Sequence, residues 1–115
     1  MEDKLVLCGA NAYEKKYYFN EKFNAIPESI KEELHIICVL FTEEVGGAFM
    51  MVFDEDGVLQ LQTDADEGDL LYDEISSGLL VKEILNKKQE LFESLTLYYR
   101  IMIKGEDPAA LLGEE

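Results

Sequence analysis

The sequence predicts a single α+β domain in which a β-hairpin packs against three helices. Two apolar segments, AFMMVF at 48–53 and VLQLQT at 58–63, flank the turn sequence DEDG at 54–57. Segments with helical spacing of apolar residues lie before and after this hairpin. The chain has 115 residues, 48% of them hydrophobic, which suits one domain with a real core over residues 1–115.

The N-terminal part gives one clear element and one ambiguous segment. Residues 4–8, KLVLC, predict a short strand that is able to join the sheet. Residues 11–26 carry aromatic residues four apart, which favours a helix, but KYYF and the asparagines favour an extended segment with turns. We expect irregular structure there with room for one helical turn, and the choice between helical and extended stays open.

A mostly buried helix is predicted over 27–45. Pro27 suits the first turn, and Gly46 offers a left-handed C-cap. Apolar residues trace one helical face, which Ile36, Val39 and Leu40 widen. The alternative ends this helix near Leu34 and makes residues 35–41, HIICVLF, a strand, because their β-branched content is high.

The hairpin at about 48–63 is the strongest local signal. Gly57 follows a type I turn in the left-handed position, and its φ should be positive. Leucines alternate with glutamines in the second strand, so this strand has one wet face. The first strand is apolar throughout and should be central.

Two further helices are predicted, over 66–79 and 82–104. The N-cap candidates of the first are Thr63, Asp64 and Asp66. Its apolar stripe consists of Leu70, Leu71, Ile75, Leu79 and Leu80, and Ser76-Ser77-Gly78 predicts a kink. Residues 105–115 form an acidic C-terminal tail.

Charge is distributed unevenly along the chain. The net charge is −15, and residues 32–81 contain many acids but no Lys or Arg. Such a field repels nucleic acid and anionic membranes and favours either solubility or a basic partner. No apolar run approaches the length of a membrane span, and the acidic start MEDKLVLCGAN does not fit a signal peptide. We therefore expect a cytoplasmic protein with reduced thiols, although the sequence leaves a disulfide open.

The acidic run at 53–74 does not fit a calcium loop. Placing Gly57 at the sixth position of the loop puts Val52 at the first and Thr63 at the twelfth, and neither can serve. Turn formation, helix capping and solvation account for the acids instead. We expect no metal and no cofactor. His35 has no identifiable catalytic partner, and no catalytic residue is assigned.

The candidate interaction or ligand residues lie near the N-terminus. Cys8 could be reactive, because Gly9 and Asn11 would leave backbone amides free beside it. The complete candidate set is Cys8, Asn11, Tyr13, Tyr17 and Tyr18. Cys38, on the apolar helix face, should behave as a core residue.

Several strings carry a resemblance to a known family: LCGANAYEKKYYFNEKF, IPESIKEEL, VLFTEEVGG, FDEDG, LLYDEI and ELFESLTLYYR. Together they resemble a family of short acidic proteins from Firmicutes, chiefly Clostridia. That family has no assigned activity, so the resemblance implies a bacterial cytoplasmic setting and no mechanism. Residues 30–95 are also similar in element order to the first half of roadblock domains, although the later strands of that fold are missing.

We expect a small non-enzymatic binding or regulatory module with an unidentified protein partner. One alternative is a small-molecule or enzymatic role for the LCGAN and tyrosine segment. Another is an acidic decoy that competes with nucleic acid for a basic protein. The uncharged strand VLQLQT and the wide apolar face of the last helix also favour a homodimer, and the oligomeric state stays open.

Overall fold

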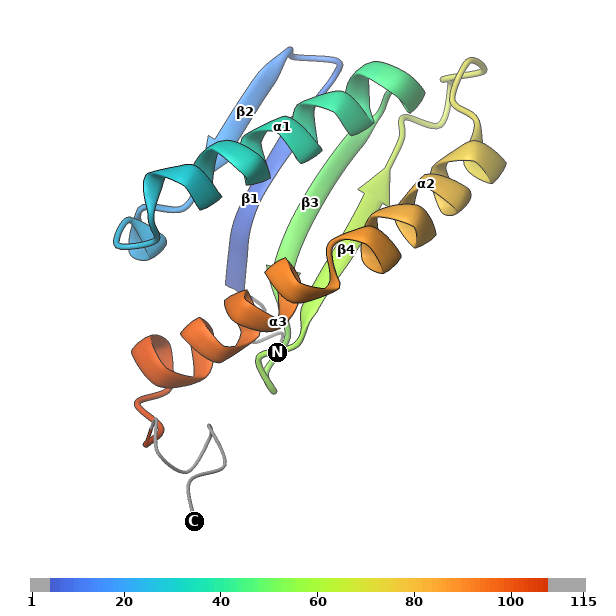
Figure 1. Ribbon diagram of the computed structural model, residues 1–115. Coiled ribbons are helices and arrows are strands. Elements are labelled where there is room, and N and C mark those ends of the chain that lie inside the picture. Colours follow the sequence, from blue (N-terminus) through green and yellow to red (C-terminus); the bar gives the residue numbers. More distant parts are fainter. Residues whose placement is uncertain (1–4, 108–115) are drawn as a thin grey trace.

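The computed structural model describes residues 5–107 and shows a four-stranded antiparallel sheet in the order β2-β1-β3-β4, with all helices on one face (Figure 1). The elements in chain order are β1 (Leu5–Asn11), β2 (Lys16–Phe19), a 3₁₀ turn η1 (Glu21–Phe23), α1 (Glu28–Val45), β3 (Ala48–Phe53), β4 (Leu59–Asp64), α2 (Glu74–Lys87), α3 (Gln89–Tyr98) and a π-helical turn η2 (Tyr99–Ile103). The predicted α+β class is confirmed, and the sheet is twice as wide as the predicted hairpin.

The N-terminal strand exists and is central. β1 pairs with β2 on one side and with β3 on the other. The ambiguous segment 11–26 therefore contains a strand and a 3₁₀ turn, and the expectation of irregular structure was wrong for KYYF. KYYF becomes a strand because it pairs with the edge of β1, a contact between segments that local sequence does not show. The side chain of Asn20 donates a hydrogen bond to the carbonyl of Val6 at 2.7 Å and holds the end of KYYF beside β1.

The predicted hairpin is confirmed as β3 and β4, and β3 is a central strand. Gly57 has a φ of +85°. Asp54 starts the turn, because its Oδ1 accepts the backbone N–H groups of Asp56 and Val58 at 2.9 and 3.0 Å. These bonds to the charged form, led by the one from Val58, lower the pKa of Asp54.

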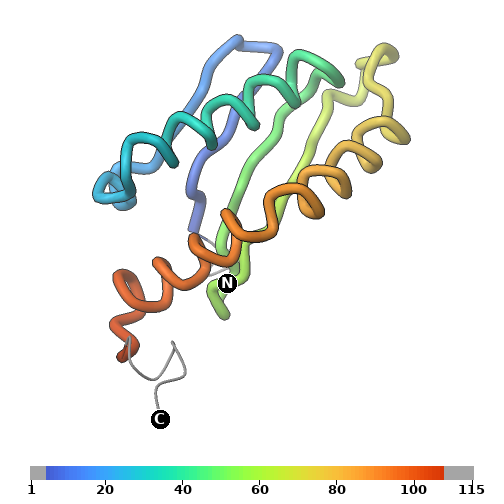
Figure 2. The backbone as a smooth tube through the Cα atoms, viewed as in Figure 1, coloured from blue at the N-terminus to red at the C-terminus, as the bar shows by residue number. Residues whose placement is uncertain are grey.

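α1 is one helix, so the alternative strand at 35–41 is wrong. The expectation that this helix is mostly buried is also wrong, because Ile36 and Leu40 are 57% and 56% exposed. The helix lies on a single sheet, and no other element of residues 5–107 covers its outer side (Figure 2).

The C-terminal helices differ most from the prediction. The helix expected over 66–79 begins only at Glu74, where Asp73, rather than Thr63, Asp64 or Asp66, forms the N-cap. α2 then runs through 76–78 without the predicted kink and ends at Lys87, so the helix expected over 82–104 is split in two. The change of direction at Lys88 lets Tyr99 reach the sheet.

Aromatic side chains build the core between the sheet and the helices. Phe41 of α1 stacks on Phe49 of β3 with ring centroids 4.4 Å apart. At the other end of β3, Phe53 stacks on Tyr99 at 4.7 Å. These contacts fix α1 and η2 on the same face of β3, because residues two apart in a strand share a face. Residues 108–115, which hold most of the predicted acidic tail, lie outside the described residues.

Candidate functional site

The two cysteines meet in the core. Cys8 of β1 and Cys38 of α1 are both fully buried, and their Sγ atoms lie 3.7 Å apart as free thiols. The contact with Cys8, together with burial, raises the pKa of Cys38 well above its usual range. Burial in an apolar environment makes thiols inert, so this pair fills space between strand and helix.

Tyr17 of β2 closes the core above the cysteines. Its ring stacks on His35 of α1 with centroids 4.2 Å apart and planes 25° apart. Its hydroxyl is buried and has no hydrogen-bond partner among the described residues. Burial first, and then the charge that the neighbouring thiols would carry if ionised, raises the pKa of Tyr17 far above 10. The hydroxyl is therefore a neutral group at physiological pH.

Asn11 shapes the turn between β1 and β2. Its Oδ1 accepts the backbone N–H groups of Tyr13 and Glu14 at 2.8 and 3.2 Å. Beside this turn lies a cleft of about 530 Å³ between the β1–β2 hairpin and α1. The cleft is lined by Asn11, Lys15, Lys16, Tyr17, His35 and Glu43, among others.

Tyr13 and Tyr18 lie elsewhere. The hydroxyl of Tyr13 donates to Asp69 at 2.6 Å and accepts the backbone N–H of Asp66 at 3.0 Å, so it anchors the loop after β4. Tyr18 pairs with Gly9 and lies on the sheet face opposite to the helices, 55% exposed. The five predicted residues thus do not form one site, since Cys8 belongs to the core and Tyr13 and Tyr18 are separate.

A different surface stands out, at the end of β4 and the start of α2. Four large apolar side chains are exposed there: Leu70 and Leu71 at 93%, Ile75 at 77% and Leu79 at 63%. Acids lie between and beside them. We call this region the acidic–apolar surface; it consists of Leu70, Leu71, Ile75 and Leu79 with Asp64, Asp66, Glu67, Asp69, Asp73 and Glu74.

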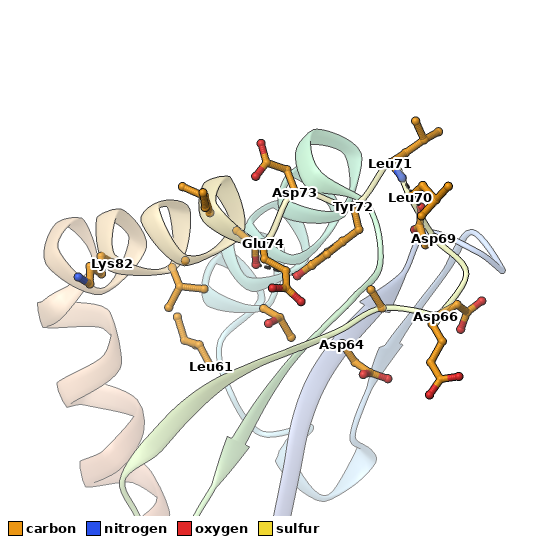
Figure 3. Close-up of a pocket in the computed structure, with 17 residues that line it drawn as sticks. Leu61, Asp64, Asp66, Asp69, Leu70, Leu71, Tyr72, Asp73, Glu74 and Lys82 are labelled. Carbon is orange, nitrogen blue, oxygen red and sulfur yellow. Dashed lines mark hydrogen bonds between the residues drawn. The ribbon is translucent and has the colours of Figure 1, made fainter.

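Hydrogen bonds hold the leucines outward. Asp69 accepts the backbone N–H of Leu71 at 3.0 Å. Tyr72 points toward α2, and its hydroxyl donates a hydrogen bond to Ser77 Oγ at 2.7 Å. In Figure 3, Leu70 and Leu71 point away from the body of the domain, whereas Tyr72 points back toward α2. The hydrogen bonds of Asp69 and Tyr72 therefore hold the loop in a conformation that exposes Leu70 and Leu71.

Asp73 fixes where α2 begins. Its carboxylate accepts the N–H of Ser76 at 3.0 Å and the Ser76 hydroxyl at 2.7 Å. The hydroxyl bond, and then the N–H bond, lowers the pKa of Asp73. The acid is thus a capping group that stays charged, and it contributes to the negative potential of the acidic–apolar surface.

A groove of about 1290 Å³ separates β4 from α2 beneath this surface. Leu61 and Thr63 line it from the strand, and Ile75, Val81 and Lys82 line it from the helix. Sequence reasoning missed this region, because Leu70, Leu71, Ile75 and Leu79 were assigned to a packed stripe. The available signal was the lack of any Lys or Arg from 32 to 81.

Metal ligation has no structural basis in residues 5–107, where no group of three or more His, Cys, Asp or Glu side chains is arranged to hold an ion. Several acids are already engaged by backbone N–H groups, as at Asp54 and Asp73. Within the same described range, none of the helices is sufficiently long and apolar to cross a membrane.

Comparison with known proteins gives a family and nothing closer. A model described as a family of unknown function, DUF6145, matches residues 4–107, which is nearly the whole chain. No curated protein and no solved structure matches.

Proposed function

Because the chain belongs to the DUF6145 family, whose function is unknown, we propose its role from its own surface: it is a small binding or regulatory module that docks a basic protein partner on the acidic–apolar surface. The observation that carries this proposal is the nearly complete exposure of Leu70 and Leu71 among acids. Contiguous exposed apolar patches with a polar rim are typical of protein interaction sites.

The physical argument combines an apolar and an electrostatic contribution. Burying one leucine or isoleucine side chain on a partner contributes about 1.5–3 kcal/mol before the costs of association. The acids steer a basic partner toward the surface and disfavour acidic ones. Binding should therefore weaken as salt rises, while the apolar contribution remains.

We place this module in a bacterial cytoplasm. Both cysteines are free thiols although they lie within contact distance, which fits a reducing compartment. The proposal assigns no catalytic residue, since the pKa changes at Tyr17 and Cys38 follow from burial and direct contact in the core.

The test compares two matched pairs of apolar substitutions in full-length bait protein. Leu70→Ser with Leu71→Ser removes the centre of the acidic–apolar surface. Ile36→Ser with Leu40→Ser removes two exposed apolar residues from α1, outside this surface. Each bait is used for quantitative affinity purification from the native cytoplasm. We expect a basic protein that is retained by the wild type and by the α1 pair but lost with the leucine pair.

Capture that is equal for all three baits would contradict the proposal. Capture that is lost only with the α1 pair would move the site to α1. A partner of acidic composition would also refute the electrostatic part of the proposal.

A second candidate function is small-molecule binding in the cleft beside Asn11. It is favoured by two consecutive lysines, Lys15 and Lys16, beside the stacked rings of Tyr17 and His35. A small aromatic carboxylate such as benzoate is a suitable probe. Saturable shifts of the His35 ring signals in NMR would support this function, and their absence at millimolar probe would remove it.

The acidic decoy for nucleic-acid-binding proteins is less well supported. Phosphate mimicry requires spaced acids on a polar surface, whereas here leucines protrude between the acids.

A further inference from the structure

The free edge of β4 exposes backbone N–H and C=O groups beside the groove between β4 and α2. β4 is the last strand of the sheet on its side. Asp54 donates its N–H to the carbonyl of Val58 at 3.0 Å, at the start of the β3–β4 ladder. Hydrogen-bonded and non-bonded pairs alternate in an antiparallel ladder, so Gln60 and Gln62 bond to β3.

It follows that the N–H and C=O groups of Leu59, Leu61 and Thr63 point away from β3, toward the open edge. No hydrogen bond between these outward groups and another residue is found in the part of the chain that the structure describes. The strand carries no charge from Leu59 to Thr63 that would protect this edge.

α2 lies beside this edge and packs on the core through the partly buried side chains of Leu80, Val81 and Ile84. Of its residues only Ser77 is buried, and the groove between the strand and the helix is open. Figure 3 shows Leu61 on the strand side of the groove and α2 along its other side. Leu61 and Val81 give the groove apolar contacts from strand and helix, polar and charged side chains line the rest, and Asp64 and Asp66 lie at the end of the strand. An unpaired strand edge beside an apolar groove is the arrangement that accepts an additional β-strand.

Charge selects the occupant. A second copy of the chain would bring another net charge of −15 to this edge. A segment that carries Lys or Arg would be attracted by the acids of the acidic–apolar surface. The opposite edge, β2, differs, because Lys16 lies in it and Lys15 beside it. Edge position alone therefore does not distinguish the two sides of the sheet, but charge does.

We propose that β4 accepts an extended basic segment of the partner protein as a fifth strand, with apolar side chains of that segment in the groove between β4 and α2. This rests on the proposed function and specifies how the partner binds. Main-chain bonds to Leu61 and Thr63 give affinity, alternate apolar side chains pack on Leu61 and Val81, and the bases meet the surrounding acids.

The test uses two short peptides of alternating lysine and valine with identical sequence and capped ends. One carries N-methyl groups on two consecutive central residues. Consecutive amides of a strand point to opposite sides, so either orientation of the methylated peptide loses a bond and clashes with β4. Charge and apolar content stay nearly the same, and the protein is unaltered, so a folding defect cannot mimic the result.

Binding is measured by fluorescence anisotropy of each labelled peptide with the full chain, in about 0.15 M salt. We expect the methylated peptide to bind at least about ten-fold more weakly, as the loss of one or two desolvated hydrogen bonds implies. Hydrogen exchange at the Leu61 and Thr63 amides should slow on addition of the unmethylated peptide. The Gln60 and Gln62 amides, already bonded to β3, serve as the internal control.

Equal affinity of the two peptides, or unchanged exchange at Leu61 and Thr63, would overturn strand addition. If both peptides bind equally and the double substitution Leu70→Ser with Leu71→Ser abolishes the binding of both, the acidic–apolar surface remains the docking site, and only binding by strand addition is refuted. If neither peptide binds, the strand proposal fails, whereas affinity purification still decides the proposed function.

The second copy is the competing occupant. Light scattering of the free chain at tens of micromolar should give a mass near 13.1 kDa. A dimer in which the Leu61 and Thr63 amides are protected without any peptide would show that β4 pairs with itself, and this outcome would overturn the proposal.

Discussion

Two helices on the same face of the sheet, α1 and α2, meet that face in different ways. α1 buries six residues, among them Leu34, Cys38 and Phe41, against β1 and β3. α2 has a similar content of large apolar residues but buries only Ser77. Ile75 and Leu79 of α2 remain 77% and 63% exposed. Apolar composition alone therefore does not tell which helix builds the core.

The difference separates stability from recognition. Residues that contact the sheet through α1 contribute the burial that folding requires. Ile75 and Leu79 of α2 keep their apolar area exposed, whereas Leu80, Val81 and Ile84 of the same helix pack on the core. We propose that the groove between β4 and α2 receives the partner. The following predictions test this division, from the largest expected effect to the smallest.

The largest effect is expected from truncating the α1 side of the core. Phe49→Ala removes a fully buried ring that stacks on Phe41, and should destabilise the fold by about 3–5 kcal/mol. Leu71→Ala, at a 93% exposed position, should change stability by no more than about 0.5 kcal/mol. Urea denaturation measures both. Comparable losses for the two variants would mean that the loop before α2 is part of the folding core.

The junction between the two regions depends on Gly47. This residue has a φ of +71°, and a Cβ there would lie 2.5 Å from the carbonyl oxygen of Asp64 and 2.8 Å from the Tyr72 ring. Gly46 has a similar φ of +80° but open space around it. Gly46→Ala should cost roughly 1–3 kcal/mol through backbone strain, because φ +80° with ψ −167° is essentially a glycine conformation. Gly47→Ala should cost roughly 1–3 kcal/mol more through the clash. Thermal unfolding of the two variants gives the difference, and equal losses would show that Tyr72 is not packed against the sheet end.

A smaller effect is expected from the ion pair between the regions. Lys88 lies 2.7 Å from Glu33 of α1, and both side chains are 39% exposed. Glu33→Gln should cost roughly 0.2–1 kcal/mol, and less in high salt. Glu83→Gln is the matched control, because Glu83 pairs with Lys87 within α2 alone. Only the Glu33 variant should loosen the contact between α1 and the start of α3, which hydrogen exchange at residues 88–92 would report.

The smallest effect is a local response of α2 to acid. The pKa of Asp73 is lowered by its bonds to Ser76, so the capping contribution is fully present above the unfolded value of about 3.9. It is lost as the pH falls through the lower folded value. The Ser76 amide should then exchange faster, while the amides of α1 stay protected. Asp73→Asn keeps a cap and should remove this pH dependence; an unchanged dependence would assign the response to another acid.

The sequence predicted the elements whose signals are local. The turn at 54–57 and its positive φ at Gly57 follow from residue types that favour that turn. Pro27 and Gly46 bracket α1 as expected, but Gly46, with φ +80° and ψ −167°, does not have the predicted left-handed conformation. The fate of KYYF depended on whether β1 had a free edge, and no local pattern contains that information. The helix expected over 66–79 begins later because Thr63, Asp64 and Asp66, the predicted caps, do not start it. Tyr13 bonds to Asp66 and Asp69 in the loop, and Asp73 forms the cap.

Some features of the candidate site also follow from the sequence, and others depend on the tertiary structure. The sequence by itself determined the net charge of the chain, on which the proposed basic partner rests, because net charge does not depend on the fold. It also determined that Cys38 lies on a buried helix face. Only the tertiary structure decided that Leu70 and Leu71 face solvent and that the edge of β4 lies free beside α2. Periodicity shows that a helix has an apolar side, but the placement of the neighbouring elements decides whether that side is covered.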